Sequence, residues 1–130
     1  MVYPLTVQRV LVIDDEEDMR VLASVFLEMG GSFEVTSVSS GEEGVLVARR
    51  TVPDLILLDY MMPGMDGPAT LRALKNDDAT RNIPVVFLTA MAKPGDIRSE
   101  LVAMGAAGAI SKPFDPAALA GEILQILESQ

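Results

Sequence analysis

The sequence predicts an α/β fold in which a parallel sheet is covered by helices on both faces. Short apolar runs bounded by turn residues alternate with segments of helical spacing, and this alternation repeats five times. Consecutive strands stay parallel because each right-handed crossover passes through a helix and a short connection cannot reverse the strand direction. The 130 residues fit one compact domain that buries roughly two thirds of its unfolded surface, so we expect no second folded domain.

Five segments have the pattern of strands. Four are short apolar runs typical of strands buried on both faces, at residues 10–13, 55–58, 85–88 and, more weakly, 109–110. The fifth, residues 33–38 (FEVTSV), mixes apolar and polar residues, which is typical of an edge strand.

Five helices are expected between and after these strands. Two begin with capping signals, Ser40 with Glu43 and Asp66 with Pro68. The first helix has apolar residues three and four positions apart and two glycines as a stop signal, and the last has a similar stripe over residues 119–127. The first stripe is Met19, Leu22, Phe26 and Met29, followed by Gly30 and Gly31. A weaker stripe over residues 97–104 marks the remaining helix.

Composition excludes several classes of function. Ten basic and 19 acidic residues give a net charge of −9, which disfavours direct binding to nucleic acid or anionic lipid. There is no Cys and no His, so any chemistry must use carboxylates, hydroxyls and lysine. No apolar run is long enough for a membrane span, and residues 1–10 resemble neither a signal nor a transit peptide. We therefore expect a cytoplasmic protein.

Polar residues follow four of the predicted strands at their carboxyl ends. These residues are Asp14 and Asp15, Asp59, Thr89, and Lys112. Ligand sites of open doubly wound sheets form at this edge, so side chains far apart in the sequence could share one pocket.

Three carboxylates in one pocket require a cation. At separations of about 4 to 5 Å they repel by roughly 4 kcal/mol per pair at an effective dielectric near 20. Oxygen ligands alone suit a hard ion such as Mg²⁺, which shares its remaining positions with a phosphoryl oxygen. A carboxylate beside such an ion can attack phosphorus, while a lysine and a hydroxyl neutralise the transferred oxygens.

Taken singly, each residue has an ordinary structural explanation. The acidic run 14–18 could be a solvated helix start, and the Pro, Gly and Asp residues after Asp59 are turn formers. Thr89 is a common strand residue, and Lys112 could lie on the surface. Polar residues that merely face water would not all fall at the carboxyl ends of the strands, so their joint placement at four strand ends favours a site.

Four segments together resemble the receiver domain of bacterial two-component response regulators: VLVIDDEEDM, DLILLDYMMPGMDG, VVFLTA and ISKPF. The resemblance spans nearly the whole chain, with the motifs in the expected order. It implies a flavodoxin-like three-layer sandwich with strand order 2-1-3-4-5, a receiver domain at residues 8–130 and an N-terminal extension at residues 1–7.

The resemblance also implies the roles of the site residues. Asp59 would accept a phosphoryl group from a histidine kinase or histidine phosphotransfer protein. Asp15, Asp59 and the backbone carbonyl of Met61 would ligate Mg²⁺, and Asp14 would act through a bound water. Lys112 would pair with the phosphoryl group, Thr89 would turn inward to bond it, and the Lys112–Pro113 peptide bond would be cis.

The sequence departs from the family pattern in two places. Ala109 stands where the family commonly has a Tyr or Phe that rotates on phosphorylation, and an alanine has no rotamer to switch. Either the output face senses the movement of Thr89 and the following loop alone, or this receiver signals differently. Met61 and Met91 stand two residues after the acceptor and the hydroxyl residue. We expect these apolar side chains to orient and admit hydrolytic water poorly and to lengthen the life of the phosphorylated form.

The function expected from these observations is a phosphorylation-dependent switch that acts on a downstream protein or effector domain through residues 93–128, as a monomer or weak dimer. One alternative is a Mg²⁺-dependent phosphohydrolase with an aspartyl nucleophile, but its second carboxylate would fall at Met61. A nucleotide-binding fold lacks its glycine-rich motif here. A degenerate receiver serving only for contacts is the remaining alternative, disfavoured by the intact acidic and basic residues.

Overall fold

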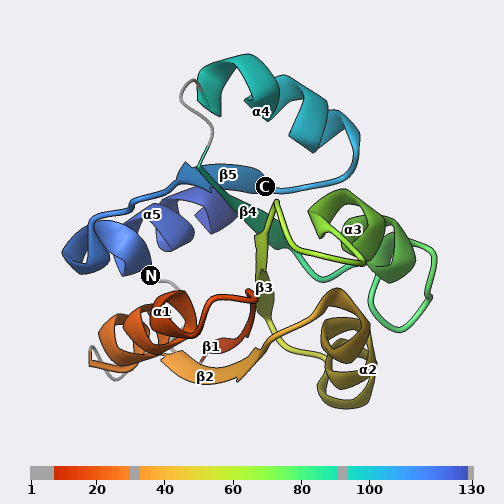
Figure 1. Ribbon diagram of the computed structural model, residues 1–130, viewed down its shortest axis with the longest axis horizontal. Helices are drawn as coiled ribbons and strands as arrows, with labels where there is room; N and C mark the ends of the chain where they lie inside the picture. Colours follow the sequence, from red (N-terminus) through yellow and green to blue (C-terminus); the bar gives the residue numbers. More distant parts are fainter. Residues whose placement is uncertain (1–7, 30–32, 91–93, 129–130) are drawn as a thin grey trace.

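The computed structural model, which describes residues 8–29, 33–90 and 94–128, has a three-layer arrangement of one sheet between two groups of helices (Figure 1). Strands and helices alternate along the whole described chain. The strands are β1 (Gln8–Ile13), β2 (Phe33–Val38), β3 (Leu55–Asp59), β4 (Val85–Thr89) and β5 (Gly108–Ser111). The helices are α1 (Glu17–Met29), α2 (Gly41–Thr51), α3 (Gly67–Lys75), α4 (Pro94–Ala103) and α5 (Pro116–Glu128). None of the described helices has the length and apolar character needed to cross a bilayer.

The sheet is parallel throughout, with strand order β2-β1-β3-β4-β5. This order confirms the expected doubly wound fold, and β2 lies at an edge as its mixed sequence predicted. The strand order reverses at β1, because the chain passes from β1 to β2 on one side of it and then returns to β3 on the other side. A ligand site is therefore expected beyond the carboxyl ends of β1 and β3.

Two apolar cores lie on the two faces of the sheet. One packs α1 and α5 against the sheet, with Ala23 and Leu27 from α1 and Leu119 and Ile123 from α5 fully buried. The other packs α2, α3 and α4 against the opposite face (Figure 1). Every residue of β3 and β4 is buried, which explains their continuous apolar sequences.

Both predicted capping signals are present. The Ser40 hydroxyl accepts a hydrogen bond from the Glu43 N–H at 3.2 Å, and the Asp66 carboxylate accepts one from the Ala69 N–H at 2.9 Å. Pro68 lies in the first turn of α3, where a missing N–H costs nothing. These caps fix where the chain leaves the sheet edge that carries the acidic residues.

The core face of α1 differs from the predicted stripe. Ala23 and Leu27 are buried, whereas Met29 is 72% exposed and Met19, Leu22 and Phe26 are half-buried. The spacing of these residues predicted the helix correctly, but it does not mark the residues that the helix buries. An α-helix turns about 100° per residue, so Met29 lies about 200° from Leu27 and points to solvent. The predicted stop at Gly30 and Gly31 and the N-terminal extension 1–7 lie outside the described residues.

Candidate functional site

The strand register brings the acidic residues to the same level. Ile13 of β1 pairs with Leu58 of β3, so Asp14 and Asp59, which follow them, end neighbouring strands side by side. The Asp14 N–H donates to the Val38 carbonyl at 3.2 Å, which extends the β1–β2 ladder by one residue. The sheet itself therefore holds the backbone of the acidic cluster.

Lys112 approaches the acidic cluster from the loop after β5. Its backbone N–H donates to the Thr89 carbonyl at 2.7 Å, which holds this loop against the end of β4. Its Nζ lies 3.0 Å from Asp14 Oδ2 and 3.2 Å from Asp59 Oδ1. The Lys112–Pro113 peptide bond is cis, as the sequence resemblance implied.

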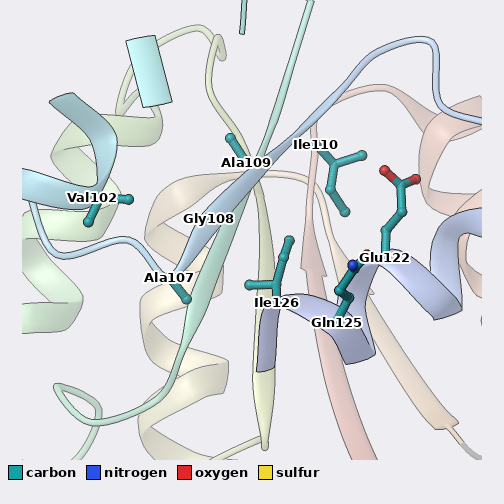
Figure 2. Close-up of a pocket in the computed structure, with 8 residues that line it drawn as sticks. All are labelled: Val102, Ala107, Gly108, Ala109, Ile110, Glu122, Gln125 and Ile126. Carbon is teal, nitrogen blue, oxygen red and sulfur yellow. The ribbon is translucent and has the colours of Figure 1, made fainter. Parts of the chain in front are cut away.

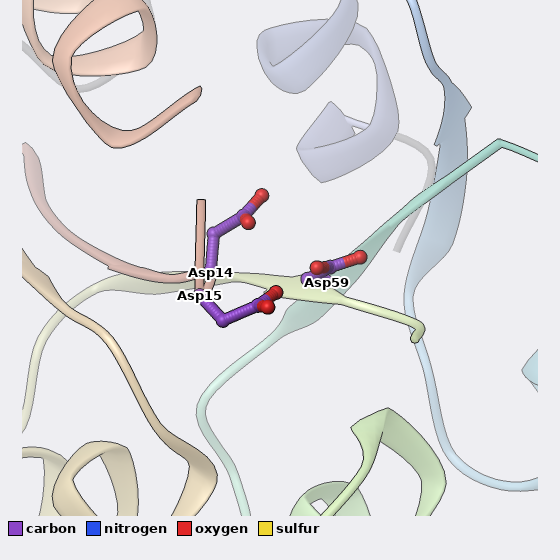
Figure 3. A group of neighbouring side chains, drawn as sticks. All are labelled: Asp14, Asp15 and Asp59. Carbon is purple, nitrogen blue, oxygen red and sulfur yellow. The ribbon is translucent and has the colours of Figure 1, made fainter. Parts of the chain in front are cut away.

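Three carboxylates gather at the ends of β1 and β3 (Figure 3). Asp14, Asp15 and Asp59 each offer an oxygen, and these oxygens all lie within 4.8 Å of one another. Asp14 has no exposed surface and Asp59 is 4% exposed, whereas Asp15 faces solvent. A pocket of about 310 Å³ opens beside them and is lined by Asp15, Glu16, Asp59, Met61, Ala90 and Lys112.

The site raises the pKa of Asp59 to about 7. Burial is the largest cause because it disfavours the charged carboxylate, and the neighbouring charge of Asp14 adds to it. The ammonium group of Lys112 and the Met61 N–H, which donates to Asp59 Oδ1 at 3.3 Å, lower the same pKa but do not outweigh these effects. Asp59 is thus a buried carboxyl group beside the negative charge of Asp14, and an added cation would favour its ionised form.

The pKa of Lys112 is raised. Burial lowers it, but the hydrogen bond and charge of Asp14, and then those of Asp59, reverse that effect. Lys112 therefore stays protonated beside the two buried carboxylates, where it can neutralise anionic oxygens.

Two residues that sequence reasoning missed support the loop after β1. Glu16 donates its backbone N–H to Asp14 Oδ1 at 2.9 Å, and its carboxylate lies 3.5 Å from Lys112 Nζ. Arg20 Nη1 donates to the Asp14 carbonyl at 2.7 Å. The turn formed by Asp14 with the N–H two residues on is a known habit of Asp and could have been anticipated, whereas the Arg20 contact depends on how α1 packs.

The other predicted site residues, Met61 and Thr89, differ in how exposed they are. Met61 is 70% exposed and lines the pocket, while Thr89 is buried at the end of β4 and the next residue, Ala90, lines the pocket. Ala109 is buried in β5. Met91 lies outside the described residues.

The donor set at the cluster fits a hard divalent cation. Carboxylate oxygens are its side-chain ligands, and the chain contains no His or Cys to favour a softer metal. A divalent ion would also favour the ionised form of Asp59, whose pKa is raised first by burial and then by the charge of Asp14.

Comparison with known proteins gives relatives along most of the chain. The response regulator PleD of Caulobacter vibrioides is 44% identical over 109 residues, covering 82% of this chain and 23% of PleD. The phosphate regulon transcriptional regulatory protein PhoB of Pseudomonas aeruginosa is 36% identical over 118 residues, covering 91% of this chain and 51% of PhoB. The chain thus spans about a quarter to a half of the length of these relatives.

Solved structures show the same architecture. The chemotaxis response regulator CheY4 of Vibrio cholerae superposes with a TM-score of 0.84 at 29% identity, covering 93% of this chain and 99% of that chain. The receiver domain of a signal transduction histidine kinase from Syntrophus aciditrophicus gives a TM-score of 0.79 at 33% identity, covering 94% of this chain and 91% of that chain.

A family model, that of the response regulator receiver domain, matches residues 10–124. The match includes every strand end that carries the acidic cluster and Lys112. Proteins of this family are signalling switches that interact with histidine kinases and downstream effectors, and they bind Mg²⁺ at an acidic cluster. The chain belongs to the response regulator receiver domain family of two-component signal transduction.

Proposed function

We propose that Asp59 is the phosphoacceptor of this receiver domain and takes its phosphoryl group from a histidine kinase or a histidine phosphotransfer protein. The observation that carries this assignment is the position of the Asp59 carboxylate. It lies at the pocket, 3.2 Å from Lys112 Nζ and within reach of two further carboxylates. None of the other described acidic residues combines this burial, pocket access and pairing with a partly buried lysine.

The transfer balances as a simple displacement at phosphorus. An Asp59 carboxylate oxygen attacks the phosphorus of phosphohistidine, an O–P bond forms, and the P–N bond breaks with its electron pair staying on the imidazole nitrogen. The donor leaves as neutral histidine after taking up a proton. Because these 130 residues contain no histidine, the donor group lies outside them.

Asp14, Asp15, Asp59 and the backbone carbonyl of Met61 would hold Mg²⁺, with Asp14 acting through a bound water. When bound, the ion would neutralise charge on the transferred oxygens and shield the incoming anion from the carboxylates. Support comes from the oxygen donors within 4.8 Å of one another and from the position of Met61 on the pocket wall.

Lys112 and Thr89 would convert phosphorylation into a change of state. Lys112 bonds carboxylates in this state and would move to the phosphoryl oxygens, while the Thr89 hydroxyl would turn toward the same group. Such contacts favour one conformation because they exist in that conformation alone. The face formed by residues 93–128 would carry the change to a downstream target without a rotating aromatic residue, because position 109 is alanine.

The protein would act as a switch that gains and loses one phosphoryl group and does not turn over a substrate. A phosphohydrolase is not supported, because its general acid or base would fall at Met61, an exposed apolar residue on the pocket. A degenerate receiver is not supported either, because the acidic cluster and Lys112 are intact.

Incubation with acetyl phosphate and Mg²⁺ tests the proposal. We expect one base-labile, acid-stable phosphoryl group per chain, absent in Asp59→Asn and present in the matched variant Asp78→Asn, whose carboxylate is exposed. Steady release of phosphate without an adduct would indicate the hydrolase. No adduct in the folded parent protein would contradict the assignment of Asp59.

A further inference from the structure

Met61 lies where two pockets meet. It lines the pocket of about 310 Å³ beside the three carboxylates, called the acidic pocket below, and a neighbouring pocket of about 440 Å³ whose wall includes Tyr60, Met62 and Pro63. The Met61 N–H donates to Asp59 Oδ1 at 3.3 Å, so its backbone lies directly beside the proposed phosphoacceptor. A chemical change in the Met61 side chain would therefore act at this site.

The exposure of Met61 sets it apart from most methionines of the described chain. Met61 is 70% exposed and Met29 is 72% exposed, whereas Met62 is 7% exposed. Three more methionines are half-buried: Met19, Met65 and Met104. A thioether reacts where an oxidant can reach its sulfur, so Met61 and Met29 are the two described methionines most open to oxidation. Of these two, Met61 lines the acidic pocket and Met29 does not.

Another pocket, of about 420 Å³, lies beside β5 between α4 and α5 (Figure 2). The residues of the described chain that line it include no methionine. Oxidation of an exposed thioether would thus alter the acidic pocket and leave the pocket beside β5 chemically unchanged.

The charge of the acidic pocket favours an uncharged oxidant. Asp15, Glu16 and Asp59 line it, and Lys112 is the one basic residue of its described lining. The Lys112 ammonium group is already engaged with two buried carboxylates. An acidic lining repels anionic oxidants, whereas hydrogen peroxide is small and carries no charge. Hydrogen peroxide can therefore reach the Met61 sulfur from solvent.

We propose that Met61 is a reversible oxidation site through which peroxide shortens the life of the phosphorylated form. A lone pair of the Met61 sulfur attacks one oxygen of hydrogen peroxide, an S–O bond forms and the O–O bond breaks. The departing hydroxide takes the proton of the transferred oxygen and leaves as water, so the sulfur is oxidised to a sulfoxide and the peroxide is reduced. This inference rests on the proposed phosphorylation of Asp59 and adds a means of regulating it.

The sulfoxide would change how the acidic pocket holds water. A thioether sulfur is a weak hydrogen-bond acceptor, whereas oxidation makes the side chain polar. The reduced Met61 presents an apolar group where hydrolytic water must enter. After oxidation, the sulfoxide oxygen can accept a hydrogen bond from a water molecule and hold it near the phosphoryl group on Asp59. One net hydrogen bond gained in the transition state of hydrolysis would speed the loss of phosphate about fivefold.

Peroxide treatment of the full chain, followed by tandem mass spectrometry, tests the site of modification. We expect Met61 and Met29 to gain one oxygen each several-fold faster than the buried Met62. The two methionine sulfoxide reductases, one for each sulfoxide epimer, should then remove the oxygen from Met61. Equal rates at Met61 and Met62, or a Met61 sulfoxide that the reductases cannot reverse, would overturn the proposal.

The lifetime of the phosphorylated form tests the regulation. Met29→Leu and Met61→Leu each remove one exposed thioether and keep the other methionines of the chain, including Met91. Each variant is treated with peroxide, freed of it, phosphorylated with acetyl phosphate and Mg²⁺, and compared with its own untreated form. We expect peroxide to shorten the life of the adduct about fivefold in the parent and in Met29→Leu, and to leave it unchanged in Met61→Leu. An equal response of the two variants, or no response in Met29→Leu, would overturn the proposal.

Failure of this inference and failure of the proposed function give different results. An untreated protein that forms no adduct would contradict the role of Asp59, while the mapping of oxygen would still test Met61 as the modified residue. An adduct on Asp59 whose lifetime is the same with and without the Met61 sulfoxide would contradict the regulation alone.

Discussion

Replacing Asp59 by Asn should stabilise the metal-free protein above neutral pH, although it removes a partner of Lys112. Burial, followed by the charge of Asp14, raises the pKa of Asp59 from 3.8 to about 7 in the folded state. The ionised carboxylate therefore costs free energy in the fold that an uncharged amide of nearly the same shape does not.

The sign and size follow from proton linkage. Between about pH 4 and pH 7 the folded state holds a proton on Asp59 that the unfolded state has lost, so stability falls as pH rises through this range. Each unit by which the pKa differs between the two states corresponds to about 1.4 kcal/mol, so the difference of about three units gives a loss of stability of about 4 kcal/mol as an upper limit. Because solvent reaches the pocket, we expect Asp59→Asn to be more stable than the parent by roughly 1 to 3 kcal/mol at about pH 8, and nearly equal at about pH 4.

Urea unfolding followed by circular dichroism, in the presence of a chelator and at several pH values, measures this difference. Asp78→Asn, which removes an exposed carboxylate, should differ from the parent by the same small amount at every pH. Added Mg²⁺ should stabilise the parent at about pH 8 and the Asn variant much less, because the variant has lost a ligand. A stability difference that does not change with pH, or an Asn variant less stable than the parent at about pH 8, would refute the reasoning.

Three further predictions concern the site and its support. Lys112→Ala leaves Asp14 and Asp59 without their cation, so we expect a loss of about 2 to 4 kcal/mol in chelator, largely restored by Mg²⁺; an unchanged urea midpoint would contradict this. Met61→Asn places a polar group at the pocket and should shorten the life of the phosphorylated form several-fold, which loss of phosphate from the purified adduct measures. An unchanged or longer lifetime would contradict our account of Met61. Gly67→Ala puts a Cβ 2.6 Å from the Asp59 carbonyl oxygen and should lower the free energy of unfolding by about 1 to 3 kcal/mol. Gly121→Ala is the control: its Cβ would have no atom within 4 Å, so the variant should stabilise α5 by up to about 1 kcal/mol. Similar melting temperatures for the two variants would show that the contact at Gly67 relaxes freely.

The fold was predictable because its signals are local or periodic. Apolar runs such as those of β3 and β4 require burial on both faces, and capping residues such as Ser40 and Asp66 mark where helices begin. The face of α1 was harder to predict because apolar residues surround that helix. Which of them meet the sheet depends on how α1 lies against its neighbours, and the structure buries Ala23 while Met29 is exposed.

The sequence alone determined which residues end the strands, since each predicted site residue follows an apolar run. It could not decide how these residues share the site, because burial and distance depend on the packing of segments far apart in the chain. The tertiary structure buried Asp14 and left Asp15 exposed, brought Lys112 within reach of both Asp14 and Asp59, and added Glu16 and Arg20 to the support of the loop. The physical reason is that periodicity fixes the direction of a side chain within its own element, whereas charge, pKa and pairing are set by neighbours from other elements.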